Sequence, residues 1–249
     1  MPTVIAINQN LIFNNIAAIF FDKDGTLENS GSFWREVGIQ RARAIEKRIP
    51  GVEKPLLLAL GIHEYGLDPT GLMAVGNRWE NEIAAAAYIA KTGHSWHESK
   101  QIARFAFDEV ATSKYLVKNT KSAPLFPEVA KLLAALHSAK IKLGIISADS
   151  TQGVVEFVCN HNLQDYIQLA LGSDHKLFKP DPQLYLQACQ NLGVSPKVTL
   201  MVGDAVSDIK MAQQAGAAGT IGIVRHPKIT LPTATVQISS LAEIKILST

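Results

Sequence analysis

The fold is decided by the stretch Ile16-Ala17-Ala18-Ile19-Phe20-Phe21-Asp22-Lys23-Asp24-Gly25-Thr26. It begins with an uninterrupted apolar run, which is typical of a short strand buried on both faces. The run ends at two aspartates and a glycine, and Asp-Gly is a common turn signal. The stretch therefore predicts a buried strand with acidic side chains at its carboxyl end.

Beyond Pro124 the sequence alternates between apolar runs of strand length and helix-like stretches. Strands are expected at 142–147, 166–171, 198–202, 220–224 and 236–238, and helices at 127–139, 151–160, 182–191, 207–215 and 241–247. Segments 4–7 and 11–13 are expected as short edge strands around a turn. Such alternation is typical of an α/β fold with a doubly wound, mostly parallel sheet.

The region between the first buried strand and this alternating part has an almost wholly helical pattern. Helices are expected at 33–48, 52–60, 71–91 and 96–116, and no convincing strand falls among them. The breaks contain Pro50-Gly51 and Thr92-Gly93, which are typical of turns between helices. We therefore predict a core domain over 1–28 and 122–249, interrupted by an inserted helical domain over 29–121.

Composition narrows the possible partners. The 249 residues include 47% hydrophobic and 18% charged residues, with a formal net charge of +2. The sequence has no basic stripe of the kind that binding to nucleic acid or an anionic membrane needs. A small anionic substrate needs local positive charge only, so it is compatible with this composition. No apolar run approaches the length of a membrane span, so we expect a cytoplasmic protein. Cys159 and Cys189 are expected as buried, unpaired thiols.

Polar residues of several kinds follow the predicted strands. Ligands of doubly wound sheets bind beyond the carboxyl ends of the strands, so residues at these ends should meet in one crevice although they are far apart in sequence. The residues placed there are Asp22, Asp24, Ser147, Lys179, Gly203, Asp204 and Asp208.

This set suits phosphoryl transfer. A carboxylate nucleophile is repelled by the charge of a phosphate monoester, and a divalent cation together with a lysine ammonium would offset that repulsion. Oxygen ligands such as Asp22, Asp204 and a backbone carbonyl suit magnesium better than zinc. Asp208 lies one helical turn after Asp204, so it could bind the metal, orient a group that does, or simply stabilise the helix N-terminus.

These residues resemble the haloacid dehalogenase-like hydrolase superfamily, in its phosphatase branch. The resemblance covers about 1–28 and 122–249, and the helical insertion matches the cap domain of that family in place and size. The four motifs are matched in order by Asp22-x-Asp24-Gly25-Thr26, Ser147, Lys179 and Gly203-Asp204-x-x-x-Asp208.

The resemblance implies a role for each matched residue. Asp22 would be the nucleophile that forms an aspartyl-phosphate, and Asp24 the acid that protonates the leaving alcohol and then the base that activates water. Phosphate would be held by Ser147, the amide of Ala148, Lys179 and Thr26. Mg²⁺ would be held by Asp22, the backbone carbonyl of Asp24, Asp204 and Asp208.

Two positions depart from the usual pattern. Asp149 would repel phosphate if it faced the site, so we expect it to cap the helix that begins near Thr151. Lys23 should point away from both neighbouring aspartates by strand alternation, and it is given no catalytic role.

Each match also has a plainer interpretation. Asp22 and Asp24 could mark a solvated turn, Ser147 a strand-end turn, and Lys179 an exposed loop, although their agreement with the topology favours a site.

The favoured function is hydrolysis of a small phosphate monoester under a closing helical cap, with phosphoglycolate phosphatases the nearest in general appearance. We expect a monomer or weak homodimer. A sugar-phosphate mutase would share every core residue, and a non-catalytic binding protein on the same fold is the alternative from another class.

Overall fold

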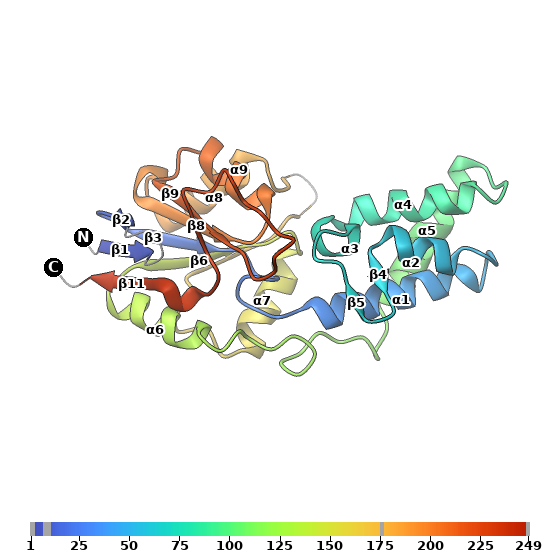
Figure 1. Cartoon of the computed structure of the whole chain (residues 1–249), viewed down its shortest axis with the longest axis horizontal. Coiled ribbons are helices and arrows are strands. Elements are labelled where there is room, and N and C mark those ends of the chain that lie inside the picture. The colour runs from blue at the N-terminus through green and yellow to red at the C-terminus, as the bar shows by residue number, and fades with distance from the viewer. Residues whose placement is uncertain (1–2, 7–10, 175–176, 248–249) are drawn as a thin grey trace. The chain divides into compact units, whose positions relative to one another are not determined.

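The computed structural model describes residues 3–6, 11–174 and 177–247, and the chain forms two compact units. Unit 1 comprises Met1–Asn29 and Pro124–Thr249, and unit 2 comprises Ser30–Ala123. Unit 1 is an α/β domain around a sheet, whereas unit 2 is almost wholly helical (Figure 1).

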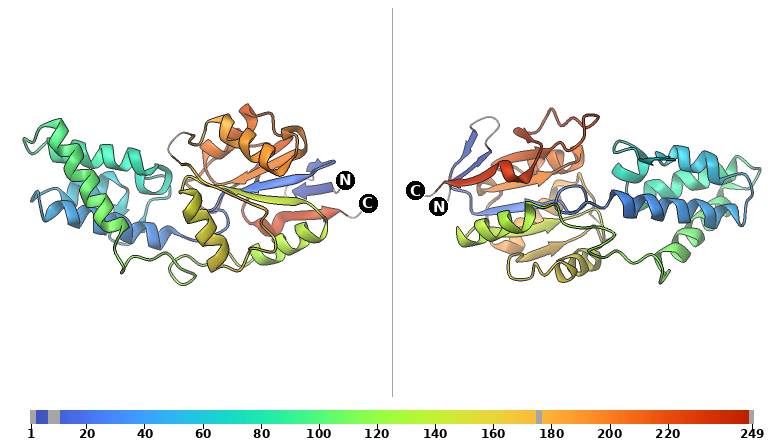
Figure 2. Two further views of the ribbon diagram at one scale, coloured as in Figure 1. Left: turned by 180° about the vertical axis from the view of Figure 1, so that it is seen from behind. Right: turned by 60° about the horizontal axis from the view of Figure 1, so that its bottom comes forward.

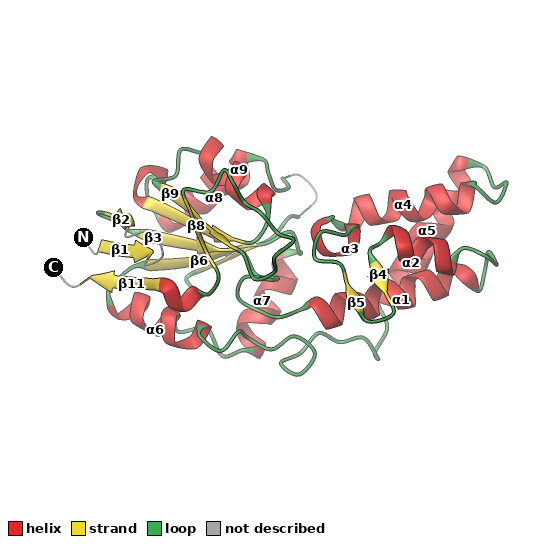
Figure 3. Ribbon diagram, in the orientation of Figure 1, coloured by secondary structure: helices red, strands yellow, loops and turns green. Residues whose placement is uncertain are grey.

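The sheet of unit 1 has six strands, all parallel, in the order β10-β9-β8-β3-β6-β7 (Figure 3). The strands are β3 (Ala18–Phe21), β6 (Lys142–Ile146), β7 (Leu169–Leu171), β8 (Thr199–Gly203), β9 (Gly219–Ile223) and β10 (Val236–Ile238). The strand predicted from the opening stretch is therefore central, between β6 and β8. The order reverses around β3, which is the arrangement of a doubly wound sheet.

Strand β3 is buried on both faces because helices cover both sides of the sheet. Ile19 and Phe21 pack in an apolar cluster with α6 (Val129–Ser138) and α7 (Thr151–Asn160). Phe20 packs on the other side with α8 (Pro182–Leu192) and α9 (Val206–Gln214), and Tyr185 of α8 meets its ring edge-on at 5.0 Å. Figure 2 shows these two helix pairs on opposite faces of the sheet. The continuous apolar run of the sequence follows from this double burial.

A second sheet in unit 1 has three antiparallel strands in the order β11-β1-β2. They are β1 (Thr3–Ala6), β2 (Leu11–Phe13) and β11 (Ile244–Leu247), and β11 follows a short 3-10 helix, η3 (Leu241–Glu243). The prediction of a helix over 241–247 is therefore wrong for 244–247, which pair with β1 as a strand. The two predicted N-terminal strands therefore pair with each other; position 7 and the predicted turn lie outside the described residues. A further 3-10 helix, η2 (Pro196–Val198), precedes β8.

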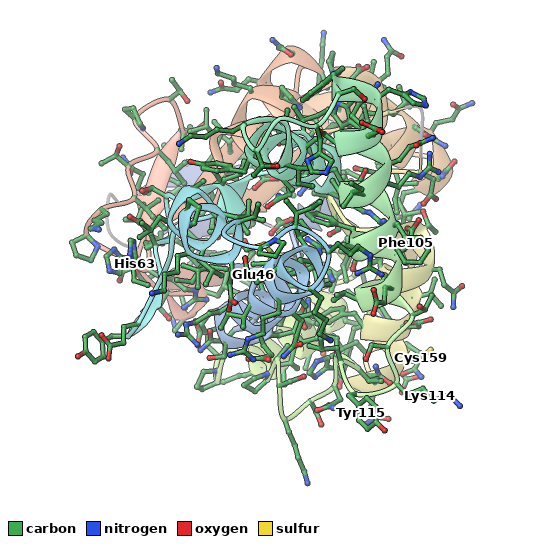
Figure 4. The ribbon with its side chains drawn as sticks, turned by 90° about the vertical axis from the view of Figure 1, so that its right-hand side faces the viewer. Glu46, His63, Phe105, Lys114, Tyr115 and Cys159 are labelled. Carbon is green, nitrogen blue, oxygen red and sulfur yellow. The ribbon has the colours of Figure 1, made fainter. Side chains whose placement is uncertain are left out.

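Unit 2 is built from five helices and a small hairpin. The elements are α1 (Gly31–Glu46), α2 (Glu53–Ala59), β4 (Ile62–His63), β5 (Gly66–Leu67), α3 (Leu72–Val75), α4 (Arg78–Ala90) and α5 (Trp96–Ala111). The carboxylate of Glu46, at the end of α1 (Figure 4), accepts hydrogen bonds from the N–H groups of Gly51, Val52 and Glu53. This side chain therefore fixes the turn into α2.

Unit 2 differs from the sequence prediction in three places. The helix predicted over 96–116 is α5, which ends five residues earlier, at Ala111. The hairpin β4–β5, which carries His63 (Figure 4), was not predicted, because two-residue strands show no periodicity. The single helix predicted over 71–91 is broken before α4, where Asn77 and Glu80 form a capping box. Such a box satisfies orphan N–H groups of a helix start, so it favours a break within a long apolar pattern.

Neither cysteine forms a disulfide. Cys189 is buried as expected, whereas Cys159 is exposed on α7 (Figure 4), so the prediction of burial is wrong for this residue. Among the described residues no helix is long and apolar enough to cross a membrane.

Candidate active site

Asp22 lies directly after the central strand. Its backbone N–H donates to the carbonyl of Val202 at 2.8 Å, which continues the pairing of β3 with β8. The side chain is 9% exposed. Because β3 is flanked by β6 and β8, the segments that follow those strands, with Ser147 and Asp204, leave the sheet at the same edge as Asp22.

Lys179 joins Asp22 to Asp208. Its ammonium lies 2.5 Å from Oδ1 of Asp22 and 2.6 Å from Oδ1 of Asp208, and its side chain is 5% exposed. Burial on its own would lower the pKa of this lysine, but the charges of Asp208 and Asp22 outweigh burial and raise the pKa above its ordinary value. Lys179 is therefore a fixed positive charge between two carboxylates.

The site holds more negative than positive charge. Oxygens of Asp22, Asp204 and Asp208 lie within 4.8 Å of one another, a spacing that could hold a metal ion. Burial, and then the charges of Asp208 and Asp24, raise the pKa of Asp22 from 3.8 to about 7 although Lys179 opposes the shift. Burial and the charges of Asp22 and Asp208 raise the pKa of Asp204 well above its usual range. A cation would relieve this repulsion.

Asp208 has two partners, one for each carboxylate oxygen. While Oδ1 pairs with Lys179, Oδ2 accepts a hydrogen bond from the N–H of Ala205 at 3.1 Å, at the start of α9. It is fully buried. Asp208 therefore stabilises the start of α9 and lies beside the other carboxylates, and its part in holding a metal stays a prediction.

Two glycines make room for the carboxylates. Gly25 has a φ of +78°, and a Cβ at this position would collide with Oδ2 of Asp204. A Cβ at Gly203 would collide with the carboxylate of Asp208. The glycines of both motifs are therefore required by close approach, and at Gly25 also by backbone conformation.

The residues expected to hold phosphate lie around the same sheet edge. Ser147 follows β6 and is buried. Its Oγ accepts a hydrogen bond from the N–H of Asp149 at 3.1 Å. Ala148 follows it and is exposed. Thr26 is fully buried, and its hydroxyl has no hydrogen-bond partner among the described residues. The role of these three residues in binding phosphate stays a prediction.

Lys23 does not behave as strand alternation predicted. Its ammonium is fully buried and lies 3.1 Å from Oδ2 of Asp24, 3.4 Å from Oε1 of Glu28 and 2.7 Å from Oδ2 of Asp149. The prediction that it points away from both aspartates is therefore wrong for Asp24. The reason is that β3 ends at Phe21, so the alternation of a strand no longer applies at position 23.

Asp149 also differs from the prediction. The cap of α7 is Ser150, whose hydroxyl accepts the N–H of Gly153 at 3.1 Å, while Asp149 pairs with Lys23. A carboxylate directed to a buried ammonium does not repel phosphate as an unpaired carboxylate would. A lysine between two aspartates at the end of a buried strand, with an acid at 28, was the available signal for this cluster.

A second basic residue was missed entirely. The guanidinium of Arg225 donates to the carbonyls of Gly25 at 3.2 Å and Thr26 at 3.3 Å, and it also pairs with Glu128 at 3.0 Å. It stacks over the ring of Phe126, 3.5 Å from the centroid. Arg225 thus fixes the loop after Asp24. Because its partners are backbone atoms about two hundred residues away, no local pattern indicates this role.

Comparison with known proteins gives a consistent family. Residues 16–216 match the family model described as haloacid dehalogenase-like hydrolase. A phosphoglycolate phosphatase of Salmonella typhimurium is 28% identical over 211 residues, covering 81% of this chain and 79% of the relative.

Solved structures show the same fold. A phosphatase of this superfamily from Thermococcus onnurineus is similar with a TM-score of 0.65 and 20% identity, covering 92% of this chain and 95% of the other. A beta-phosphoglucomutase from Clostridium difficile is similar with a TM-score of 0.63 and 19% identity, covering 90% and 91%. At these identities the likeness concerns the fold alone.

Proposed function

The chain belongs to the haloacid dehalogenase-like hydrolase family, and from this premise we propose that it is a magnesium-dependent phosphatase that hydrolyses a small phosphate monoester through an aspartyl-phosphate on Asp22. The observation that carries the proposal is the buried cluster of Asp22, Lys179, Asp204 and Asp208 at the carboxyl edge of a parallel sheet. Asp24, two residues after the nucleophile, completes the set.

The donor set fits Mg²⁺. The three clustered carboxylates have one buried ammonium among them, that of Lys179, which pairs with Asp22 and Asp208. This leaves an excess of negative charge, and hard oxygen ligands are those that Mg²⁺ prefers. The residues that would hold the ion are the side chains of Asp22, Asp204 and Asp208 and the backbone carbonyl of Asp24. A bound Mg²⁺ would offset the charge of the phosphate and of the nucleophile.

The chain's own residues account for both chemical steps. In the first, an oxygen of Asp22 forms a bond to phosphorus while the bond to the leaving oxygen breaks, and Asp24 gives its proton to that oxygen. In the second, Asp24 takes a proton from water as the water oxygen attacks the same phosphorus, which releases inorganic phosphate and restores the Asp22 carboxylate. Lys179 keeps a positive charge beside Asp22 throughout.

The groups that would bind the phosphoryl oxygens come from three loops. Ser147 and the N–H of Ala148 follow β6, and the buried hydroxyl of Thr26 follows the catalytic pair. Lys179 would bridge the phosphoryl group and Asp22. Oxygens that carry charge in the transition state are stabilised by such preorganised donors.

We further propose that unit 2 is a cap that closes during turnover and sets the substrate. Closure would exclude bulk water from the phospho-enzyme except for the attacking molecule. Phosphoglycolate is the favoured substrate because the similar protein of Salmonella typhimurium is named a phosphoglycolate phosphatase. Cytoplasmic location, and a monomer or weak homodimer, complete the proposal; two free cysteines suit a reducing compartment.

A sugar-phosphate mutase is the second candidate, since a beta-phosphoglucomutase shares the fold over most of both chains. It would use the same nucleophile and the same acid, and would differ in the acceptor of the phosphoryl group. Product analysis separates the two: a mutase would convert one sugar phosphate into another without net release of phosphate.

The test is phosphate release from p-nitrophenyl phosphate, 2-phosphoglycolate and glucose phosphates, with Mg²⁺ or with EDTA. We expect Mg²⁺-dependent turnover by the wild type, with loss of at least a thousandfold in Asp22→Asn because the nucleophile is removed. Asp165→Asn, which changes an exposed aspartate of unit 1, is the matched control and should keep full activity. Turnover that survives Asp22→Asn would contradict the proposal.

A further inference from the structure

The strongest feature that the proposed mechanism leaves unused is the charge cluster around Lys23. Lys23 and Glu28 are both buried, with side-chain exposures of 1%, whereas the side chains of Asp24 and Asp149 are 27% and 28% exposed. One ammonium is thus shared by three carboxylates. Burying a lysine is costly unless it is paired, so this arrangement needs an explanation beyond chance contact.

The ammonium is anchored by two carboxylates besides that of Asp24. Glu28 approaches from the same loop, where its backbone bridges to Asp24 and to Leu125. Asp149 approaches from the loop after β6, and its carboxylate accepts the N–H of Ser150 at 2.7 Å. A Cβ at Gly153 would be too close to that carboxylate, so Asp149 is packed against the first turn of α7.

The third partner is the acid of the proposed reaction. Oδ2 of Asp24 lies 3.1 Å from Lys23 Nζ, and the carboxylate has no comparable burial of its own. A half-exposed aspartate in a turn can adopt several rotamers, and a charge partner that is itself immobile selects among them. The same cluster reaches the phosphate-binding loop, since Asp149 donates its N–H to Ser147 Oγ at 3.1 Å.

We propose that Lys23 is a positioning residue for Asp24: its buried ammonium, anchored by Glu28 and Asp149, holds the Asp24 carboxylate for proton transfer to the leaving oxygen. The inference rests on the proposed function, because it assigns a role within that reaction. It also assigns the acids at 28 and 149 to the same task and ties the catalytic turn to the loop of Ser147.

The test uses the leaving group. A p-nitrophenolate leaves without a proton, whereas the alkoxide of 2-phosphoglycolate needs one from Asp24. Because kcat/KM reports the steps up to departure of the leaving group, Lys23→Met should lower kcat/KM about tenfold to a hundredfold for the alkyl ester and less than about threefold for the aryl ester. Any other alkyl phosphate that the wild type hydrolyses serves equally.

Three further variants separate positioning from folding. Lys142→Met removes a lysine of the same sheet whose ammonium bonds to the carbonyl of Leu192, and it should leave the ratio of the two kcat/KM values unchanged. In Lys23→Met alone, Glu28 would keep a buried negative charge without the ammonium of Lys23. The double variant Lys23→Met with Glu28→Gln removes that charge. Lys23→Met in an Asp24→Asn background should add little, because residues acting through one another are not additive.

A readout without turnover completes the test. In the metal-free protein, the carboxyl ¹³C resonance of Asp24 should move in Lys23→Met and in Asp149→Asn, and stay in place in Lys142→Met. Equal loss of kcat/KM on both esters, or an unmoved resonance, would overturn the role of Lys23. Absence of turnover by the wild type on every ester would instead overturn the proposed function, and this inference with it.

Discussion

Removing the charge of Asp22, the proposed nucleophile, should make the metal-free protein more stable. Burial and neighbouring carboxylates raise the pKa of Asp22 from 3.8 to about 7 in the folded state. A group with a raised folded pKa favours folding below its unfolded pKa, and this contribution is lost as pH rises through the folded value. Ionised Asp22 therefore opposes folding above pH 7, whereas the neutral amide of Asp22→Asn does not.

The magnitude follows from the size of the shift. About three pK units correspond to at most about 4 kcal/mol at pH 8, falling below about 2 kcal/mol at pH 5, where the folded protein keeps Asp22 protonated. At about 2–4 °C per kcal/mol for a domain of this size, the corresponding rise in Tm is at most roughly 8–16 °C at pH 8. Wild type should therefore gain Tm on going from pH 8 to pH 5.5, and Asp22→Asn should gain less.

The assay is calorimetry in EDTA at several pH values, with Asp165→Asn as the exposed control. Tryptophan fluorescence is unsuitable because Trp34, Trp79 and Trp96 all lie in unit 2 and report on the other unit. Adding Mg²⁺ should raise the Tm of the wild type more than that of the variant. A bound cation offsets the repulsion among the carboxylates, and the variant has one carboxylate fewer. A Tm for Asp22→Asn at or below that of wild type at pH 8 would refute the reasoning.

Two further predictions concern the loop after Asp24. Gly25→Ala should weaken Mg²⁺ binding at least tenfold, measured by calorimetric titration, because its Cβ displaces the carboxylate of Asp204. Gly193→Ala shares the positive φ but has open space around its Cβ, so unchanged Mg²⁺ affinity there would assign the effect to the collision. Arg225→Met should lower kcat about tenfold by loosening the loop carbonyls, and Arg225→Lys should restore part of it. Full activity in Arg225→Met would show that Glu128 and the remaining contacts hold the loop without it.

Much of unit 1 could be predicted from the sequence because its signals are local. The run before Asp22 is apolar on every residue, as a strand covered on both faces requires. Helix α8 begins at Pro182 with Asp181 as its N-cap, the side chain of Asp181 accepting the N–H of Gln183. Such signals depend on neighbours in the chain, so they survive without knowledge of the tertiary structure.

The surroundings of Lys23, Asp149 and Arg225 could not be predicted, because tertiary structure decides which groups these side chains meet. Strand alternation assigned Lys23 to the wrong side because the position of a strand end is a tertiary property, set here by where β3 stops pairing with β6 and β8. Asp149 was assigned to a helix cap because a nearby helix start is visible in sequence, whereas a buried lysine 126 residues away is not. Arg225 acts on carbonyl groups, which every residue has, so its partners leave no trace in sequence.

Asp22 and Asp24, the two aspartates in the turn after β3, are paired with different lysines. Asp22 is served by Lys179, 157 residues away, next to two further carboxylates that suit a metal ion. Asp24 is served by Lys23, its own neighbour, whose charge is balanced by Glu28 and Asp149.

A nucleophile must keep its negative charge near an anionic substrate, and an acid must gain and lose a proton, so the two carboxylates need different surroundings. Asp22 and Asp24 lie two residues apart on one turn, so their position in the fold does not by itself give them different surroundings. Separate lysines provide that difference. Lys179 pairs with the carboxylates that could hold a metal ion, whereas Lys23 pairs with acids outside that cluster. Removing the positive charge at position 23 should therefore impair proton transfer by Asp24 and leave nucleophilic attack by Asp22 largely intact.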